Sequence, residues 1–193
     1  MITIQMPVRL FAGEGCVAAN KDVFSGTGSA CLIVTGRSAA EKSGALREAT
    51  ALFDALGIRS QIFSGVRENP TVESCRAAGE EGASFGADFV LGIGGGSAMD
   101  AAKAVSVFAA NPGLSEEAFY EKAWDKPPLP ILLIGTSAGT GSEVTDVSVL
   151  TDQKGRKHSI HDPRLFAAAA FGDWRYTCSQ PEKTTVSAAL GEQ

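Results

Sequence analysis

The sequence lacks long basic runs and long apolar runs. Its longest cluster of basic residues is Arg156-Lys157, and 17 Lys and Arg stand against 22 Asp and Glu, for a net charge of −5. A general attraction to nucleic-acid phosphates is therefore not expected. No segment approaches the roughly 20 apolar residues that a membrane span needs, and the N-terminus has no basic segment before an apolar run. We expect a cytoplasmic protein that binds neither nucleic acid nor membrane.

Cysteine and histidine are also scarce. The four cysteines are far apart and form no Cys-x-x-Cys pair, so we expect reduced thiols and neither a disulfide framework nor a zinc framework. The only histidines are His158 and His161, just before Asp162. A small metal site on a turn is one interpretation of this group, and two histidines without a metal is the ordinary one.

The 193 residues, 44% of them hydrophobic and 20% charged, suit one globular domain. Short apolar runs alternate with longer helix-like segments, which predicts an α/β fold with a parallel sheet flanked by helices. The predicted strands are 31–35, 58–63, 89–93 and 131–134, and the predicted helices are 39–56, 72–85 and 100–110. Thr71 is the expected N-cap of the second helix. Residues 144–150 are expected to be extended before a turn at 152–155, and the remainder has little periodicity.

A first glycine-rich loop follows strand 89–93 and contains Gly94, Gly95, Gly96 and Ser97. Glycines let a phosphate approach the backbone amides, and the start of the next helix favours an anion. The loop departs from the usual dinucleotide fingerprint, because Ser97 stands where a third glycine or alanine is expected. A purely structural tight turn is the alternative.

A second loop, at residues 135–145, follows strand 131–134 and mixes glycine with hydroxyl side chains. Hydroxyls and free amides suit hydrogen bonds to a cofactor, although a plain surface turn is again the alternative. Two such loops at the ends of two apolar strands favour a ligand site, because α/β sheets bind ligands outside the carboxyl ends of their strands.

Together, Gly94-Gly95-Gly96-Ser97 with Asp100 and Lys103, and the segment 136–143, resemble the two signature loops of the iron-containing (group III, metal-dependent) alcohol dehydrogenase family. Further matches are the segments 11–15 and 69–71, and Lys157. The resemblance implies that residues 1–190 form a Rossmann-like, dinucleotide-binding domain. It also implies that residues 191–193 begin the family's all-helical C-terminal domain, which is otherwise absent. Residues 139–143 look like this branch and unlike the dehydroquinate synthase or glycerol dehydrogenase branches.

The resemblance also implies a cofactor site for NAD or NADP. The residues expected there are Gly36, Arg37, Ser38, Asn69, Gly94, Gly95, Gly96, Ser97, Asp100, Thr136, Ser137, Thr140, Ser142 and Lys157. The first loop would face the pyrophosphate, with Thr136 and Thr140 nearest the nicotinamide. Asp100 would hold loop and helix together, or be an ordinary charge in a first helical turn.

The end of strand 31–35 favours NADP over NAD. NAD-preferring members of the family often place an aspartate there for the adenosine ribose, whereas this sequence has Gly36-Arg37-Ser38. Gly36 leaves room for a 2′-phosphate and Arg37 can pair with it. A solvated Arg37 in a surface turn is the alternative.

The family holds its divalent metal, Fe²⁺ or Zn²⁺, with an Asp and three His that follow the region covered here. The register places the aspartate at Gly191 and the first histidine beyond Gln193. We therefore expect that this chain alone binds no metal and carries no catalytic residue. The expected function is the NAD(P)-binding part of an alcohol/aldehyde oxidoreductase, as a fragment, a truncated gene product or half of a split enzyme. The alternative is a non-catalytic dinucleotide-binding module. The resemblance is compatible with a homodimer, while the sequence leaves the oligomeric state and the substrate open.

Overall fold

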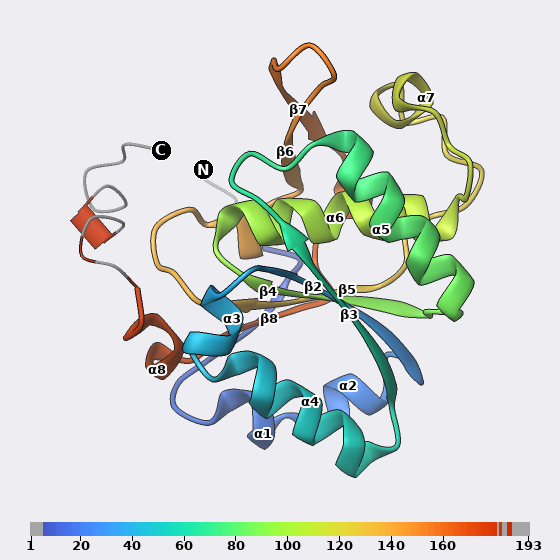
Figure 1. The fold of residues 1–193 in the computed structure, drawn as a ribbon. Helices are drawn as coiled ribbons and strands as arrows, with labels where there is room; N and C mark the ends of the chain where they lie inside the picture. Colours follow the sequence, from blue (N-terminus) through green and yellow to red (C-terminus); the bar gives the residue numbers. More distant parts are fainter. Residues whose placement is uncertain (1–5, 181, 183–184, 187–193) are drawn as a thin grey trace, which may run out of the picture.

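Six parallel strands form a sheet at the centre of the protein, in the order β1-β8-β5-β4-β2-β3 (Figure 1). The computed structural model describes residues 6–180, 182, 185 and 186. The strands of the sheet are β1 (Arg9–Ala12), β2 (Ala30–Gly36), β3 (Arg59–Val66), β4 (Phe89–Gly94), β5 (Ile131–Gly135) and β8 (Ala169–Gly172). A separate antiparallel hairpin consists of β6 (Val147–Thr151) and β7 (Lys157–His161).

Helices cover both faces of the sheet (Figure 1). On one face lie α1 (Cys16–Ala19), α2 (Lys21–Ser25), α3 (Ala39–Lys42) and α4 (Ala45–Leu56). On the other lie α5 (Val72–Phe85) and α6 (Gly96–Ala110), with the β6–β7 hairpin and α7 (Glu116–Tyr120) beyond them. The shorter elements are α8 (Trp174–Thr177) and the 3₁₀ turns η1 (Ser142–Val144) and η2 (Pro163–Leu165). The predicted α/β fold with a parallel, helix-flanked sheet is confirmed.

The core has one layer on each face of the sheet, because neighbouring side chains of a strand point to opposite faces. In β2, Leu32 and Val34 join the layer beneath α5 and α6, and Cys31 and Ile33 join the layer on α4. Every residue of α6 from Ala98 to Ala110 is buried except Asp100.

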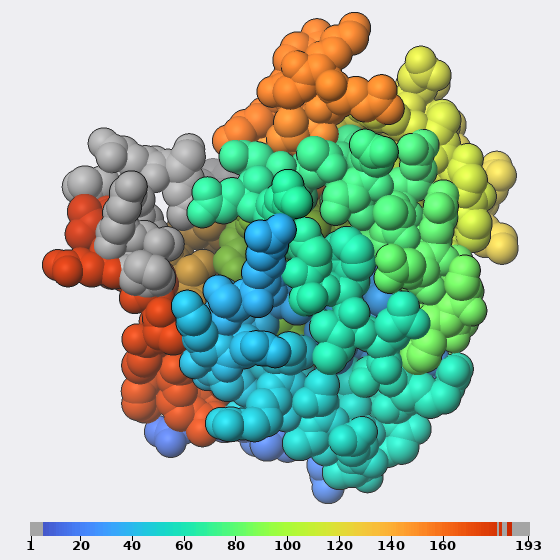
Figure 2. All heavy atoms as spheres, in the orientation of Figure 1, coloured from blue at the N-terminus to red at the C-terminus, as the bar shows by residue number. Residues whose placement is uncertain are grey.

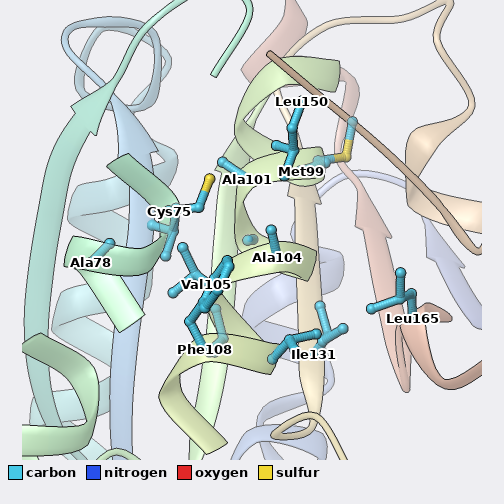
Figure 3. Packing of buried hydrophobic residues seen from close by; sticks show 14 of the residues in the cluster. Cys75, Ala78, Met99, Ala101, Ala104, Val105, Phe108, Ile131, Leu150 and Leu165 are labelled. Atoms are coloured by element: carbon cyan, nitrogen blue, oxygen red, sulfur yellow. The ribbon is translucent and has the colours of Figure 1, made fainter. Parts of the chain in front are cut away.

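Two glycines let α6 pack closely against its neighbours. A Cβ on Gly92 of β4 would lie 2.7 Å from the Ala102 Cβ of α6, and one on Gly79 of α5 would meet Phe108. Figure 3 shows the resulting layer, with side chains of α6 between those of α5 and β5. The positions of α5, α6 and β4 are therefore tightly coupled.

The order of the strands reverses direction at β2. The chain passes from β2 to β3 on one side of β2, and then to β4, β5 and β8 on the other. In sheets of this kind the crevice at the carboxyl ends of the two strands that flank the reversal is the usual ligand site. The strands concerned are β2 and β4.

Several predicted boundaries are wrong. The helix predicted over 39–56 is two helices, because Gly44 adopts a left-handed φ of 82° before α4. Strand β3 runs through Ser64 and Gly65 to Val66, since it still pairs with β2 there. Helix α6 begins at Gly96, four residues earlier than predicted, and residues 142–144 form a 3₁₀ turn. The aperiodic segments also contain β1, β7 and β8, which were not predicted.

Other predictions were right or remain predictions. Thr71 caps α5 by accepting a hydrogen bond from the Ser74 amide, and residues 152–155 connect the strands of the hairpin. Within the described residues, none of the helices is both long and apolar enough to cross a bilayer. The cytoplasmic location stays a prediction, and residues 191–193 lie outside the described part of the chain.

We predict that Gly79→Ala destabilises the protein by about 1–3 kcal/mol, although alanine favours a helix. The added methyl would meet Phe108 and lie 2.9 Å from the Ala109 amide nitrogen, so α5 and α6 would have to separate. Urea unfolding followed by circular dichroism measures the change. The control is Gly172→Ala, whose methyl would meet nothing within 4 Å. Equal stability of the two variants would contradict the close packing of α5 on α6.

Candidate functional site

Three neighbouring strands end in glycine at one edge of the sheet: β2 at Gly36, β4 at Gly94 and β5 at Gly135. Gly94 pairs with Gly135, and the Thr136 amide donates to the Gly94 carbonyl at 3.0 Å. Gly94 has a φ of 154°, which side chains rarely allow, so the chain can turn sharply into α6. Both glycine-rich loops therefore start side by side, next to the reversal between β2 and β4.

The first loop runs directly into the N-terminus of α6. Gly95 is the N-cap residue with extended backbone, and its carbonyl accepts from the Ala98 and Met99 amides. Within the described part of the chain, the amides of Gly96 and Ser97 form no hydrogen bond. Unpaired amides at the start of a fifteen-residue helix, together with the helix dipole, form a place for an anion.

The second loop packs against the first. A Cβ on Gly95 would lie 2.8 Å from the Ser137 Oγ, and one on Gly96 would lie 2.9 Å from the Thr140 Cγ2. Only glycine permits this approach from the first loop. In Figure 2 green and amber atoms, the colours of the parts of the chain that contain the two loops, are visible behind the blue and teal segments.

Asp100 and Ser142 hold the second loop to α6. The Ser142 hydroxyl donates to Asp100 Oδ1 at 2.5 Å, and the Val149 amide donates to Asp100 Oδ2 at 3.2 Å. The Ser148 hydroxyl donates to the Asp100 carbonyl at 2.8 Å. Both side chains are thus engaged with the protein, which gives them a positioning role between helix, loop and hairpin.

Lys103 adds a buried cation to the same junction. Its side chain is fully buried, and Nζ donates at 2.7 Å to the carbonyls of Ser142 and Val147. Longer contacts of 3.3 and 3.4 Å join Nζ to the hydroxyls of Ser142 and Thr145. Lys103 was recognised as part of a motif but not as a site residue. The available signal was a lysine one turn after Asp100 in a helix that is rich in alanine and other apolar residues.

Burial decides the protonation of this pair. Desolvation raises the pKa of Asp100, partly offset by the hydrogen bond from Ser142 and by the charge of Lys103. Desolvation lowers the pKa of Lys103 to about 8, although the carboxylates of Asp100, Asp146 and Glu143 oppose the shift. Lys103 therefore titrates just above neutral pH.

Asn69 and Lys157 are connected indirectly, through Pro70 and Thr151 of the hairpin. The Thr151 amide donates to the Pro70 carbonyl at 2.8 Å, and Thr151 pairs with Lys157 across the hairpin. Asn69 is exposed with a left-handed φ of 54°, and the Lys157 side chain is also exposed. Since β6 also contacts α6 through Asp100, the hairpin connects both residues with the first turn of that helix.

Gly36, Arg37 and Ser38 follow β2, the direct neighbour of β4. Gly36 pairs with Val66 of β3, so Arg37 and Arg67 follow adjacent strand ends. Both arginines are exposed, and within the described residues neither guanidinium forms an ion pair or a hydrogen bond. Arg67 was not predicted as a site residue, because its proximity to Arg37 depends on the pairing of β2 with β3.

The described residues do not fit a metal ion. No group of three or more His, Cys, Asp or Glu side chains among them could hold one. His158 and His161 are three residues apart in β7 and so point to opposite faces of the strand. His158 instead lies with its Nε2 3.0 Å from Asp152 Oδ2, at the base of the hairpin turn. Gly191, where the resemblance places a ligand, is outside the described part.

Comparison with known protein families agrees with the geometry of the two loops. A model of the family described as iron-containing alcohol dehydrogenase matches residues 7–174, which is most of the 193-residue chain. The chain belongs to the iron-containing alcohol dehydrogenase family. The match includes both glycine-rich loops, the hairpin and the end of β2.

Curated relatives from this family of dehydrogenases share about a third of their residues with the chain. A sulfoacetaldehyde reductase of Bilophila wadsworthia (strain 3_1_6) is 36% identical over 180 residues, which are 92% of this chain and 46% of that protein. The lactaldehyde reductase of Escherichia coli (strain K12) is 36% identical over 165 residues, 83% of this chain and 43% of that protein. The chain thus spans about half the length of these relatives.

Solved structures of iron-containing alcohol dehydrogenases have the same fold over this half. One from Thermotoga maritima superposes with a TM-score of 0.91 at 38% identity, covering 98% of this chain and 52% of the other. A 1,3-propanediol oxidoreductase superposes with a TM-score of 0.87 at 26% identity, covering 98% and 50%. The Rossmann-like architecture of the chain is therefore that of the family.

We predict that Lys103 makes the stability of this family member rise with pH above 8. The folded-state pKa is about 8 and the ordinary value is 10.5, so the unfolded state binds more protons between these values. The free energy of unfolding then increases with pH, by up to about 1.4 kcal/mol per pH unit from this group.

Urea unfolding of the wild type and of Lys103→Met at pH 7, 8, 9 and 10 measures the difference in slope. Lys21→Met, at an exposed lysine of α2, should keep the wild-type slope. Parallel curves for wild type and Lys103→Met would show that Lys103 does not titrate in this range.

Proposed function

We propose that the chain binds NADP or NAD across the two glycine-rich loops, as the dinucleotide-binding part of a metal-dependent alcohol/aldehyde oxidoreductase. The observation that supports it is the contact between the loops, Gly95 on Ser137 and Gly96 on Thr140, beside the reversal of strand order. The reaction of the complete enzyme would transfer a hydride between the nicotinamide and an alcohol or aldehyde.

The residues divide into binding and positioning groups in this proposal. The amides of Gly96 and Ser97 bind the pyrophosphate, with Gly94 and Gly95 leaving room for it. Ser137, Thr136 and Thr140 offer hydroxyls and amides toward the nicotinamide half of the cofactor. Asp100 and Ser142 hold the loops in place through their mutual hydrogen bond. Asn69 and Lys157 contact the cofactor from the hairpin side.

The chemistry needs more than the described residues. A metal ion would polarise the oxygen of the alcohol or carbonyl, and no described group of side chains fits one. We infer that turnover requires metal ligands from additional sequence or from a second polypeptide. Small aldehydes are the proposed substrate class, because two of the relatives are named as reductases of lactaldehyde and sulfoacetaldehyde.

A non-catalytic dinucleotide-binding module is the second candidate. It is favoured by the same combination of intact loops and a described region without a metal-ligand group. The two candidates differ in one assay, alcohol oxidation by the purified chain with added Fe²⁺ or Zn²⁺. Turnover above the rate of the metal alone would exclude the module, whereas cofactor binding without turnover would favour it.

We further propose that NADP is the preferred cofactor. Gly36 leaves space at the end of β2, and the guanidinium groups of Arg37 and Arg67, which have no partner among the described residues, follow paired strand ends. A 2′-phosphate between them would accept charge-assisted hydrogen bonds from both.

We also propose a homodimer. Met6 lies just before edge strand β1 and Leu10 lies within it, and their exposed side chains offer apolar surface for a second copy of the chain.

Calorimetry with the purified chain should detect binding of both dinucleotides, and Gly96→Ala should weaken it about tenfold or more. The new methyl would lie 2.9 Å from Thr140 Cγ2 and would separate the loops. Gly26→Ala, at the right-handed C-cap of α2, is the matched control, because α2 lies on the face of the sheet opposite α6. Absence of dinucleotide binding by the wild type would contradict this proposal. An affinity of Gly96→Ala equal to that of the wild type would contradict the role of the loop contact.

Arg37→Ala and Arg67→Ala should each weaken the binding of NADPH about tenfold or more. The affinity for NADH should stay within about twofold, because only NADPH has the 2′-phosphate. Titration of nucleotide fluorescence measures both constants. Arg9→Ala, at the opposite edge of the sheet, is the charge-matched control. Tighter binding of NADH than of NADPH by the wild type would contradict the proposed preference.

A further inference from the structure

The second glycine-rich loop is hydrogen-bonded to other segments at its two ends and, between them, through the Ala138 amide, which donates to Gln180 Oε1 at 3.3 Å. At its start the Thr136 amide is bonded to Gly94, and at its end Ser142 is bonded to α6. Gly139 and Gly141 between these points have positive φ values of 127° and 65°, and Ala138 and Gly139 are exposed. The position of the C-terminal end of the loop therefore depends on what holds Ser142.

Lys103 holds Ser142 more completely than any other described residue does. Its Nζ donates to the carbonyl of Ser142 at 2.7 Å and reaches its hydroxyl at 3.3 Å, and that hydroxyl donates in turn to Asp100. The Nζ also donates to the Val147 carbonyl at 2.7 Å, so one ammonium joins both ends of the segment 142–147.

The contacts continue from Ser142 to the first loop. The Ser142 amide donates to the Thr140 Oγ1 at 3.3 Å, and the methyl of Thr140 lies against Gly96. A continuous path thus runs from the buried ammonium through Ser142 and Thr140 to the proposed pyrophosphate site. The Lys103 side chain is fully buried, so it reaches a bound dinucleotide only through this path.

We propose that Lys103 is a positioning residue that sets the distance between the two glycine-rich loops, so that dinucleotide affinity depends on its ammonium group. This inference rests on the proposed dinucleotide function. Loss of the proton would remove one of three donors and the positive charge, while Ser142, Thr145 and Val147 still present acceptors. The end of the second loop would then be less tightly held, and Thr140 would shift from Gly96.

Dinucleotide affinity should depend on pH through Lys103. The charged groups that face Lys103 are Asp100 on α6, Glu143 on η1 and Asp146 before β6, and burial holds the pKa of the lysine at about 8. Dinucleotide affinity should therefore fall above pH 8, whereas stability rises over the same range for the reason given above. A general loosening of the fold would lower both together, so opposite trends separate a positioning role from a purely structural one.

The test measures NADPH affinity of the wild-type chain, Lys103→Met, Lys103→Arg and Lys21→Met between pH 7 and 9.5. We expect at least fivefold weaker binding by the wild type at pH 9.5 than at pH 7. Lys103→Met should bind NADPH weakly, with an affinity that does not change with pH. Lys103→Arg stays charged, so its affinity should also not change with pH and should be higher than that of Lys103→Met. Lys21→Met should follow the wild type.

Amide hydrogen exchange of the same proteins without nucleotide gives a readout that does not need cofactor binding. At pH 7 the Lys103→Met substitution should speed exchange of the Thr136, Ser142 and Val144 amides, and leave the α4 amides unchanged. Absence of NADPH binding by the wild type would refute the proposed function, and the exchange data would still test the loop. Wild-type exchange and a wild-type pH profile in Lys103→Met would overturn the role of Lys103.

Discussion

The packing of helix α6 between helix α5 and the sheet sets the position of both glycine-rich loops. Gly79 and Gly92 allow this packing, because a side chain at either position would meet α6 or its neighbours. Once the helix is placed, its N-terminus at Gly96 has one position relative to β4. Asp100 and Lys103, one and two turns further along, then determine where the second loop can attach.

The buried polar contacts of α6 contribute specificity more than stability. Removing an ammonium and a carboxylate from water is costly, and their interaction and hydrogen bonds only partly offset that cost. The lowered pKa of Lys103 reflects this balance. What the contacts supply is a defined geometry for a loop whose glycines would otherwise allow many conformations. The contacts of Asp100 and Lys103 thus fix the arrangement of the proposed cofactor site, although burying the two charged groups lowers the stability of the fold.

The chain has the two loops that we propose for cofactor binding. It has the sheet, the two loops and the hairpin of the family, and it spans about half the length of its relatives. The described residues present no group for a metal ion. In the proposed function, binding of the dinucleotide therefore belongs to the described residues, and activation of the substrate oxygen requires metal ligands beyond them.

The fold class, the family and the location of the two loops follow from the amino-acid sequence alone, because apolar strands that run into glycines are local patterns. It did not determine where helices and strands end: Gly44 could be an interior helix residue until its left-handed backbone is seen. Strands β1 and β8 have weak local signals and form because they pair with each other and because β8 also pairs with β5. The role of Lys103 and the neighbourhood of Arg37 and Arg67 were likewise decided only by the tertiary structure. Each depends on contacts between residues about 30 to 44 positions apart, which no local pattern encodes.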